Sequence, residues 1–166
     1  MPSLICHDAD MQTRTLRLIS VAFGLLIIGW FGFAGLRNEL AKRQFEALPL
    51  KTAQLGQCQF DLSLAKSTSE QRRGLSLLPV LADDRGLAFP QATAGRPNFW
   101  MHQMRFNIDL IWLNQERVVA VDPNLTLDGG RRIYPAPQPV DLIIELAAGR
   151  AEECQIKPDS PLLYPS

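Results

Sequence analysis

Residues 108–121 read Ile-Asp-Leu-Ile-Trp-Leu-Asn-Gln-Glu-Arg-Val-Val-Ala-Val, and this stretch carries the clearest secondary-structure signal in the chain. Two runs rich in β-branched and aromatic residues, Ile108–Leu113 and Val118–Val121, flank the polar residues 114–117. Because such side chains pack well on a pleated surface and polar residues favour turns, the stretch predicts a β-hairpin. The fold therefore contains antiparallel sheet.

The segments on either side of this hairpin repeat the pattern of short strands between turns. Phe60–Leu64 alternates apolar and polar residues, Leu87–Phe89 follows a turn at 83–86, and Asp141–Leu146 is a further strand. Small residues and prolines at 90–97 predict a loop. Many short strands with few helices indicate an all-β sandwich or barrel.

Two short helices are predicted within this β domain. Ser67 and Glu70 fit a capping box, in which a hydroxyl and a carboxylate accept hydrogen bonds from free amides at a helix start. Gly74 is a typical residue to end that helix. Gly149–Cys154 predicts one more helical turn near the end of the chain.

A long apolar run near the start of the chain predicts attachment to a membrane. Leu18–Leu36 has no charged residue in 19 positions, close to the roughly 20 that a membrane-spanning helix needs. Arg14 and Arg17 precede it, and a basic start before an apolar run is typical of an export signal. We expect a single-pass inner-membrane protein with a periplasmic C-terminal domain. A signal peptide cleaved near 32–34 is the alternative and places the domain on the same side.

These observations divide the 166-residue chain into four parts. They are a short tail over 1–17, a transmembrane signal anchor over 18–36, a stalk or linker over 37–57 and a β domain over 58–166. The part beyond the anchor has the size of one ordinary domain. A second domain is therefore not expected.

The charge balance argues against nucleic acid as a partner. The chain has 17 basic and 17 acidic residues, and the part after Gln44 has 12 basic and 14 acidic ones. Without a basic surplus there is little to neutralise phosphates. We expect the lipid bilayer as one partner and a small molecule, a glycan or an envelope protein as another.

The three cysteines allow one disulfide on the exported side. Cys6 precedes the apolar run, whereas Cys58 and Cys154 lie near the two ends of the β domain. The latter two could form a disulfide, or they could remain small buried thiols. The cysteines lack metal-ligand spacing, and His7 and His102 fall on opposite sides of the expected membrane. We therefore expect no metal and no cofactor.

Five blocks of residues resemble, in order and spacing, the DUF192 family, also called UPF0127. The resemblance spans roughly residues 60–163 and implies a compact, jelly-roll-like all-β domain, often preceded by a signal or membrane segment. The family carries no settled activity. The blocks are Ser67-x-x-Glu70-x-x-Arg73-Gly74-Leu75, Asp84-Arg85-Gly86-x-x-Phe89, Phe99-Trp100-Met101, Ile108-Asp109-Leu110-Ile111 and Glu145-Leu146-Ala147-Ala148-Gly149.

A segment around Trp100 is the best candidate for a ligand site. In a strand, Trp100 and His102 share one face while Phe99 and Met101 share the other, so one pair can line a groove. An aromatic ring beside polar side chains suits a sugar, a peptide or a small organic ligand. The candidate ligand-binding residues are Trp100, His102, Arg96 and Asp109. Structural roles are expected for Arg73, Gly74, Gly86 and Glu145.

Two other functions stay open at this stage. An envelope hydrolase could use His102 with Asp109 or Glu145, because imidazole suits proton transfer near neutral pH. A structural accessory of a membrane complex would need neither the histidine nor these acids. Both acids lie within apolar strands, where a buried carboxylate must be paired, and Arg73 or Arg96 could pair it. The sequence has no nucleophile elbow or phosphate loop, so we predict a binding protein without catalytic residues.

The expected topology can be tested with reporters fused after Ser166. Alkaline phosphatase, which is active outside the cytoplasm, should be active there. The same fusion with Leu25→Arg and Leu26→Arg should lose activity, because each charge at a helix centre costs about 2.5–3.5 kcal/mol of insertion free energy. An intact chain found free in the cytosol with no active fusion would contradict the prediction.

Overall fold

The computed structural model describes residues 33–165 of the chain. They belong to two compact units, Met1–Glu39 and Leu40–Ser166, and the second holds the β domain. Residues 33–46 are helical. No helix in the described range has the length and apolar character needed to cross a membrane. The anchor expected at Leu18–Leu36 lies mostly outside the described residues and stays a prediction.

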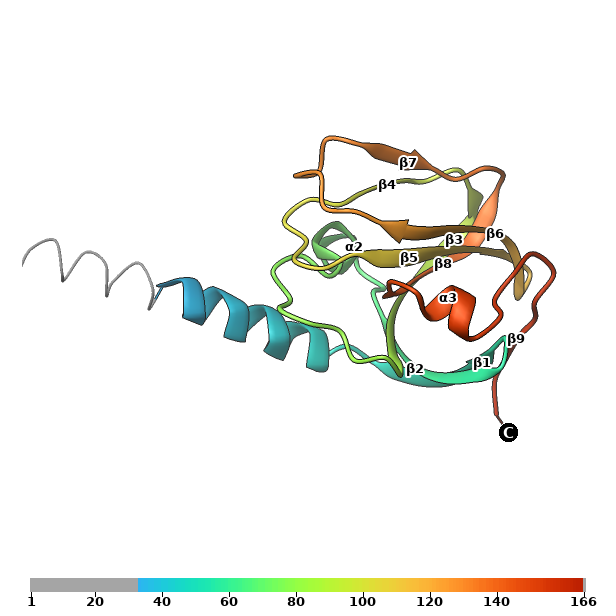
Figure 1. Cartoon of the computed structure of the whole chain (residues 1–166), viewed down its shortest axis with the longest axis horizontal. Helices are drawn as coiled ribbons and strands as arrows, with labels where there is room; N and C mark the ends of the chain where they lie inside the picture. The colour runs from blue at the N-terminus through green and yellow to red at the C-terminus, as the bar shows by residue number, and fades with distance from the viewer. Residues whose placement is uncertain (1–32, 166) are drawn as a thin grey trace, which may run out of the picture. The chain divides into compact units, whose positions relative to one another are not determined.

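The β domain is built from short strands with little helix, as predicted. Seven strands form one sheet in the order β6-β5-β8-β3-β2-β1-β9, and β4 and β7 form a second, two-stranded sheet (Figure 1). In chain order the elements are β1 (Leu50–Leu55), β2 (Cys58–Leu64), α2 (Thr68–Arg73), β3 (Arg85–Gly95), β4 (Asn98–Trp100), β5 (Ile108–Asn114), β6 (Arg117–Leu125), β7 (Ile133–Pro135), β8 (Val140–Ala147), α3 (Arg150–Glu153) and β9 (Leu162–Leu163).

The larger sheet curls into a half-barrel (Figure 1). The last described residues link its two edges, since β9 pairs with β1 at one edge. The Leu162 amide donates to the Glu116 carbonyl at 2.8 Å, and the Val118 amide at the other edge donates to the Ser160 carbonyl at 3.0 Å. The curl is thereby held together at one end by backbone hydrogen bonds.

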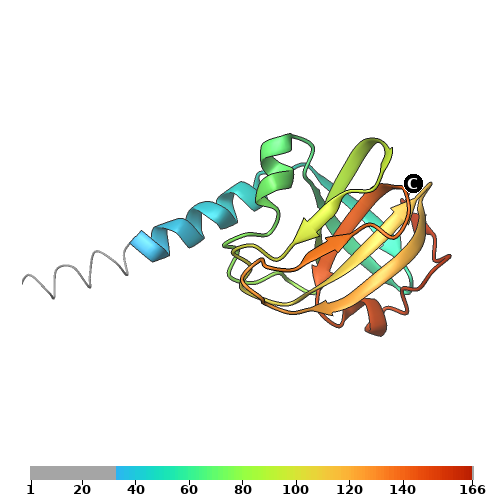
Figure 2. The same cartoon turned by 90° about the horizontal axis from the view of Figure 1, so that it is seen from above.

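Alternating side chains of the central strands supply two apolar clusters on opposite faces of the sheet. The β4–β7 pair lies on one side of the sheet and α3 on the other (Figures 1 and 2). The outer cluster, on the β4–β7 side, includes Phe45, Leu75, Leu87, Phe89, Met101, Leu110, Trp112, Tyr134 and Ile143. The inner cluster, on the α3 side, includes Leu55, Phe60, Leu62, Ile111, Leu113, Ile144, Leu146, Ala151 and Cys154.

The β5–β6 hairpin forms where the sequence predicted it. Its turn residues Gln115 and Glu116 both have positive φ, 50° and 58°. Two such residues in a row match the right-handed twist of the flanking strands, which is why two-residue hairpin turns adopt this geometry. The predicted α2 is also confirmed: Ser67 and Glu70 form the capping box, and Gly74 caps the helix end.

Strand β3 is longer than the sequence indicated. It continues through Pro90 to Gly95, most of the segment expected to be a loop at 90–97. Its pairing with β8 is irregular between Pro90 and Gly95. Such an irregularity tolerates a proline, which has no amide to donate to a neighbouring strand.

The β domain begins earlier than the boundary predicted at Cys58. Leu50–Leu55 is a full strand that pairs with β2, and Ala41 and Phe45 of the preceding helix are buried. The segment 37–57 is therefore not a free stalk over its whole length. Phe45 of the helix and Ala53 and Leu55 of β1 are buried in the domain's own core.

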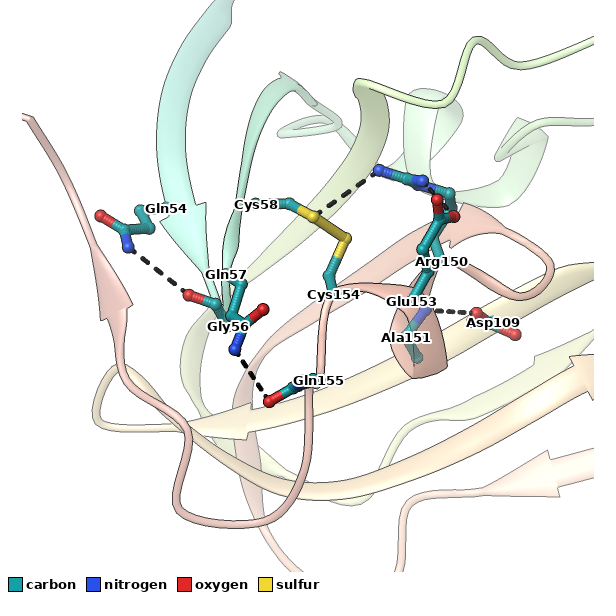
Figure 3. Close-up of a disulfide and its surroundings, with 10 residues drawn as sticks. All are labelled: Gln54, Gly56, Gln57, Cys58, Asp109, Arg150, Ala151, Glu153, Cys154 and Gln155. Carbon is teal, nitrogen blue, oxygen red and sulfur yellow. Dashed lines mark hydrogen bonds and ion pairs between the residues drawn. A yellow bond between two sulfur atoms is a disulfide. The ribbon is translucent and has the colours of Figure 1, made fainter.

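Cys58 and Cys154 are bonded in the structure, which decides between the two alternatives left open by the sequence. Their Cα atoms lie 5.4 Å apart, and the bond joins β2 to the residue that caps α3 (Figure 3). The Cys154 carbonyl accepts from the Gln57 amide at 2.8 Å. An Arg150 guanidinium nitrogen lies 3.7 Å from the Cys58 sulfur. The disulfide thus fixes α3 against the β1–β2 hairpin.

Removing this disulfide should lower stability strongly. The two cysteines are 96 residues apart in sequence, and a loop of that size corresponds to about 4–5 kcal/mol of unfolding free energy. The double variant Cys58→Ala with Cys154→Ala should lose about that amount in urea unfolding of the full chain. Cys6→Ala is the matched control and should unfold as the native chain does. Equal midpoints for the double variant and the native chain would contradict the bond.

Candidate ligand-binding site

A pocket of about 180 Å³ lies on the outer side of the sheet, lined by α2, the residues after it, β3, β4 and β8. Its volume is below the roughly 300 Å³ at which pockets for drug-sized ligands begin. Aromatic and apolar side chains share the lining with amides, guanidinium groups and one carboxyl group. The pocket therefore suits one small polar unit with a flat or apolar face.

The carboxyl group belongs to Glu145, near the centre of the sheet on β8. Glu145 pairs in register with Leu87 of β3 and Leu110 of β5, so its side chain lies on the outer face with them. It is only 5% exposed, and its Oε2 atom has no hydrogen-bond partner among the described residues. Burial raises the pKa of Glu145 to about 8. The group is therefore a neutral carboxylic acid at neutral pH.

The end of α2 passes over this carboxyl group. Gly74 has φ 53°, and a Cβ atom there would lie 3.8 Å from the Glu145 Oε2 atom and 3.8 Å from the Phe89 ring. The Gln71 side-chain nitrogen donates to the carbonyls of Ala65 at 3.2 Å and Pro90 at 3.1 Å. These bonds fix α2 beside β3 and so define one wall of the pocket.

Trp100 supplies the exposed aromatic surface of the pocket. Phe99 and Met101 pack with the outer cluster, and Trp100 is 49% exposed; Phe99 and Trp100 both line the pocket. Because β4 ends at Trp100, the alternation expected to place His102 on the same face does not continue. The Phe99 ring meets Phe89 and Trp112 edge to face, with centroids 5.0 and 5.6 Å apart. Trp100 is therefore carried on a well-packed strand and presents a free ring surface to the pocket.

Two other candidate residues do not join this pocket. His102 is exposed and follows the end of β4; its backbone carbonyl accepts from the Ser76 hydroxyl at 2.8 Å. Arg96 donates from its guanidinium group to the Pro137 carbonyl at 3.1 Å. Neither side chain is part of the lining. The structure brings Trp100 together instead with residues to which the sequence assigned structural roles.

Asp109 is a fully buried structural acid. Its Oδ1 accepts from the Asn124 amide at 2.8 Å. Its Oδ2 accepts from the Ala151 amide at 2.7 Å (Figure 3). Asp109 thereby joins β5 to β6 and to α3. The suggestion that Arg73 or Arg96 pairs this carboxylate is wrong, because backbone amides already satisfy both of its oxygens.

Asp109 and Glu145 lie on opposite faces of the sheet. Asp109 is in register with Leu146 of the inner cluster, whereas Glu145 is in register with Leu110 of the outer cluster. The hydrolase alternative needed His102 together with one of these acids, and His102 lines neither the pocket of Glu145 nor the one beside Asp109. Neither of these two pairs therefore shares a pocket in the described residues.

Two of the expected structural glycines have clear packing reasons. Gly74 permits the backbone angle at the end of α2, as described above. A Cβ atom on Gly86 would lie 2.8 Å from side-chain carbons of both Leu62 and Leu146. No side chain larger than hydrogen fits there without moving its neighbours. Glycine at this position lets the inner cluster close over β3.

Several polar lining residues were not identified from the sequence. They are Gln71, Arg72, Gln91 and Asn98, contributed by α2, β3 and β4. The only sequence signal for Gln71 and Arg72 is their position next to Arg73 and Gly74. Among residues 33–165, no group of three or more His, Cys, Asp or Glu side chains could hold a metal ion.

Two solved crystal structures share this fold. A provisionally assigned transcription regulator from Sinorhizobium meliloti 1021 has a TM-score of 0.66 at 19% identity, covering 69% of this chain and 93% of that chain. A protein of unknown function from Novosphingobium aromaticivorans DSM 12444 has a TM-score of 0.65 at 24% identity, covering 69% and 85%. At such identities the likeness shows the fold alone.

Sequence comparison agrees with the resemblance found from the motifs. The model of the DUF192 family, described as an uncharacterized ACR, matches residues 50–163. No curated protein matches the chain. The matched range begins at the first residue of β1 and ends at the last residue of β9.

The neutral state of Glu145 predicts a pH dependence of stability. Its pKa is about 8 in the folded chain, above the ordinary value of 4.5 that applies when unfolded. Between these values the folded state binds the proton more tightly, so the free energy of unfolding should fall as pH rises from 5 to 8. The Glu145→Gln side chain cannot ionise, so this variant should lack the part of the decrease in unfolding free energy that comes from Glu145. Glu152→Gln, an exposed control, should keep it, and identical pH profiles for all three chains would contradict the burial argument.

Proposed function

The chain belongs to the DUF192 family, and within this uncharacterised family we propose that it is a non-catalytic binding protein of the cell envelope. It holds one small polar ligand in the pocket beside Trp100 and Glu145. The observation that carries the proposal is a half-exposed aromatic ring in the same pocket as a buried carboxyl group without a partner.

The unpartnered carboxyl group supports a ligand contact. A buried polar atom that lacks a hydrogen bond costs about 1–3 kcal/mol. The Asp109 carboxylate avoids this cost through two backbone amides, whereas the Glu145 Oε2 atom has no protein partner in the described chain. A ligand hydroxyl or carbonyl group at the base of the pocket offsets that cost and gains a hydrogen bond.

The remaining lining favours a sugar unit or a similarly shaped small molecule. Trp100 offers a rigid ring surface, and the amide side chains of Gln91 and Asn98 offer hydrogen bonds around it. The small volume admits a single unit. A longer glycan or a peptide would place one residue inside and the rest along the surface.

Binding is favoured over hydrolysis by the number of acids in the pocket. Glycoside hydrolysis ordinarily needs two carboxyl groups about 5–10 Å apart on either side of the bond. Among the described lining residues, Glu145 is the one acid. The pocket therefore has a group that can bind but lacks the pair that ordinarily cleaves.

The envelope location is supported by two features of the chain. The uncharged run Leu18–Leu36 has the length of a membrane anchor. The Cys58–Cys154 disulfide is of a kind that persists in oxidising compartments such as the periplasm. We place the β domain on the periplasmic side of the inner membrane, attached through the N-terminal segment.

The binding function is tested by titrating the full chain with a panel of monosaccharides and following the heat of binding by calorimetry. At least one sugar should bind, and Trp100→Ala should weaken that binding tenfold or more, or about 1.4 kcal/mol. Ile133→Ala is the matched control: it lies opposite Trp100 on β7, is 59% exposed and does not line the pocket. Equal losses in both variants, or no binding by any sugar in the panel, would overturn the proposal.

A further inference from the structure

The charged groups of the pocket are arranged by depth. Glu145 lies at the base, almost fully buried, while Arg72 is exposed and Arg73 is half-buried at the last turn of α2. In the described lining these three are the ionisable charged side chains. Because the buried acid keeps its proton at neutral pH, the pocket carries net positive charge.

The guanidinium groups are available to a ligand. Within residues 33–165, the Arg72 side chain makes no hydrogen bond and no ion pair. The pKa of Glu70 is lowered chiefly by its hydrogen bond with the Ser67 amide, and the charge of Arg73 adds a smaller contribution without an ion pair. Glu70 itself is held in the capping box by the amides of Lys66 and Ser67. Neither arginine is thus bound to a protein acid, and a guanidinium group is well suited to a carboxylate.

The surroundings of Glu145 explain why it does not cancel this positive charge. Leu87 and Phe89 of β3 and Leu110 of β5 are apolar neighbours on its face of the sheet. From α2, Arg73 lines the same pocket, but burial is the cause that sets the raised pKa of Glu145. A protonated carboxyl group can donate a hydrogen bond and does not repel an anion.

We propose that the pocket selects an acidic monosaccharide unit, such as a uronic acid. Its ring lies against Trp100, the Glu145 carboxyl group donates a hydrogen bond to one of its oxygens, and Arg72 and Arg73 bind its carboxylate. This inference rests on the proposed function and names the ligand class of that same site. It assigns Glu145 a direct contact with the ligand, beyond the structural role expected from the sequence.

The geometry implies a definite pH dependence of binding. Ionisation of Glu145 removes its donated hydrogen bond and places a negative charge beneath an anionic ligand. Arg72 and Arg73 keep their charge throughout this range. The affinity for an acidic sugar should therefore fall as pH rises through about 8. A neutral sugar loses only the hydrogen bond, so the affinity for it should decrease less over the same pH range.

The test compares D-glucuronate with D-glucose on the full chain by calorimetry at pH 6.5 and pH 9. Glucuronate should bind at least tenfold more tightly than glucose at pH 6.5 and lose at least tenfold in affinity by pH 9. Glu145→Gln, which keeps a donor of similar size, should bind glucuronate at pH 6.5 with little change at pH 9.

Charge variants separate the two contacts. Arg72→Gln with Arg73→Gln should remove the preference for glucuronate over glucose. Lys66→Gln is the matched control, since Lys66 is an exposed cation beside α2 that does not line the pocket; it should leave the preference unchanged. A loss of preference in the control as large as in the double variant would overturn the assignment of the arginines.

The remaining outcomes distinguish this inference from the proposed function. If glucose binds as well as glucuronate and Trp100→Ala weakens both, the selection of an acid is wrong while the binding function stands. If glucuronate is preferred but its affinity is the same at pH 6.5 and pH 9, the Glu145 contact is wrong. If neither these two sugars nor any in the panel binds, both proposals fail.

Discussion

The structure depends on β8, a strand that is buried on both of its faces between β5 and β3. Successive side chains of a strand point to opposite faces, so Ile143 enters the outer cluster while Ile144 and Leu146 enter the inner one. Glu145 follows the same rule and is carried into an apolar layer. A carboxyl group held there gives up its charge unless the protein supplies a partner. The chemistry of the pocket thus follows from the place of one strand in the sheet.

The two buried acids show how partners decide the role of a side chain. Asp109 faces the inner side, where the amide of Ala151 in α3 donates to one carboxylate oxygen and the amide of Asn124 in β6 donates to the other. The Cys58–Cys154 bond closes the same side covalently. The inner side is therefore satisfied by the fold itself. Glu145 faces the outer side, where the β4–β7 pair and α2 leave a pocket above it. The fold thus supplies partners for the buried acid on one face and leaves the buried acid on the other face unpaired among the described residues, beside a pocket.

Local signals in the sequence predicted most elements, because each depends on neighbouring residues. The β5–β6 hairpin, the Ser67–Glu70 capping box and the α3 turn are of this kind. The extent of β3 was missed because pairing with β8 overrides the loop preference of residues 90–97. The helical turn that carries Phe45 was read as a stalk because its burial depends on a core assembled much later in the chain.

The site could be predicted only in part, because some of its features depend on contacts between distant parts of the chain. Trp100 was identified from alternation within β4, which is a local pattern, but the face that Glu145 occupies depends on its register with β3 and β5. The sequence suggested an arginine partner for Glu145, and Arg73 does line the same pocket. It does not bind the acid, however, and the Oε2 atom stays unpaired. An apolar side chain would fill that position of the outer cluster without a desolvation cost. The cost of burying this carboxyl group is therefore not offset by a contact within residues 33–165 of the fold, and the proposed ligand supplies the missing partner.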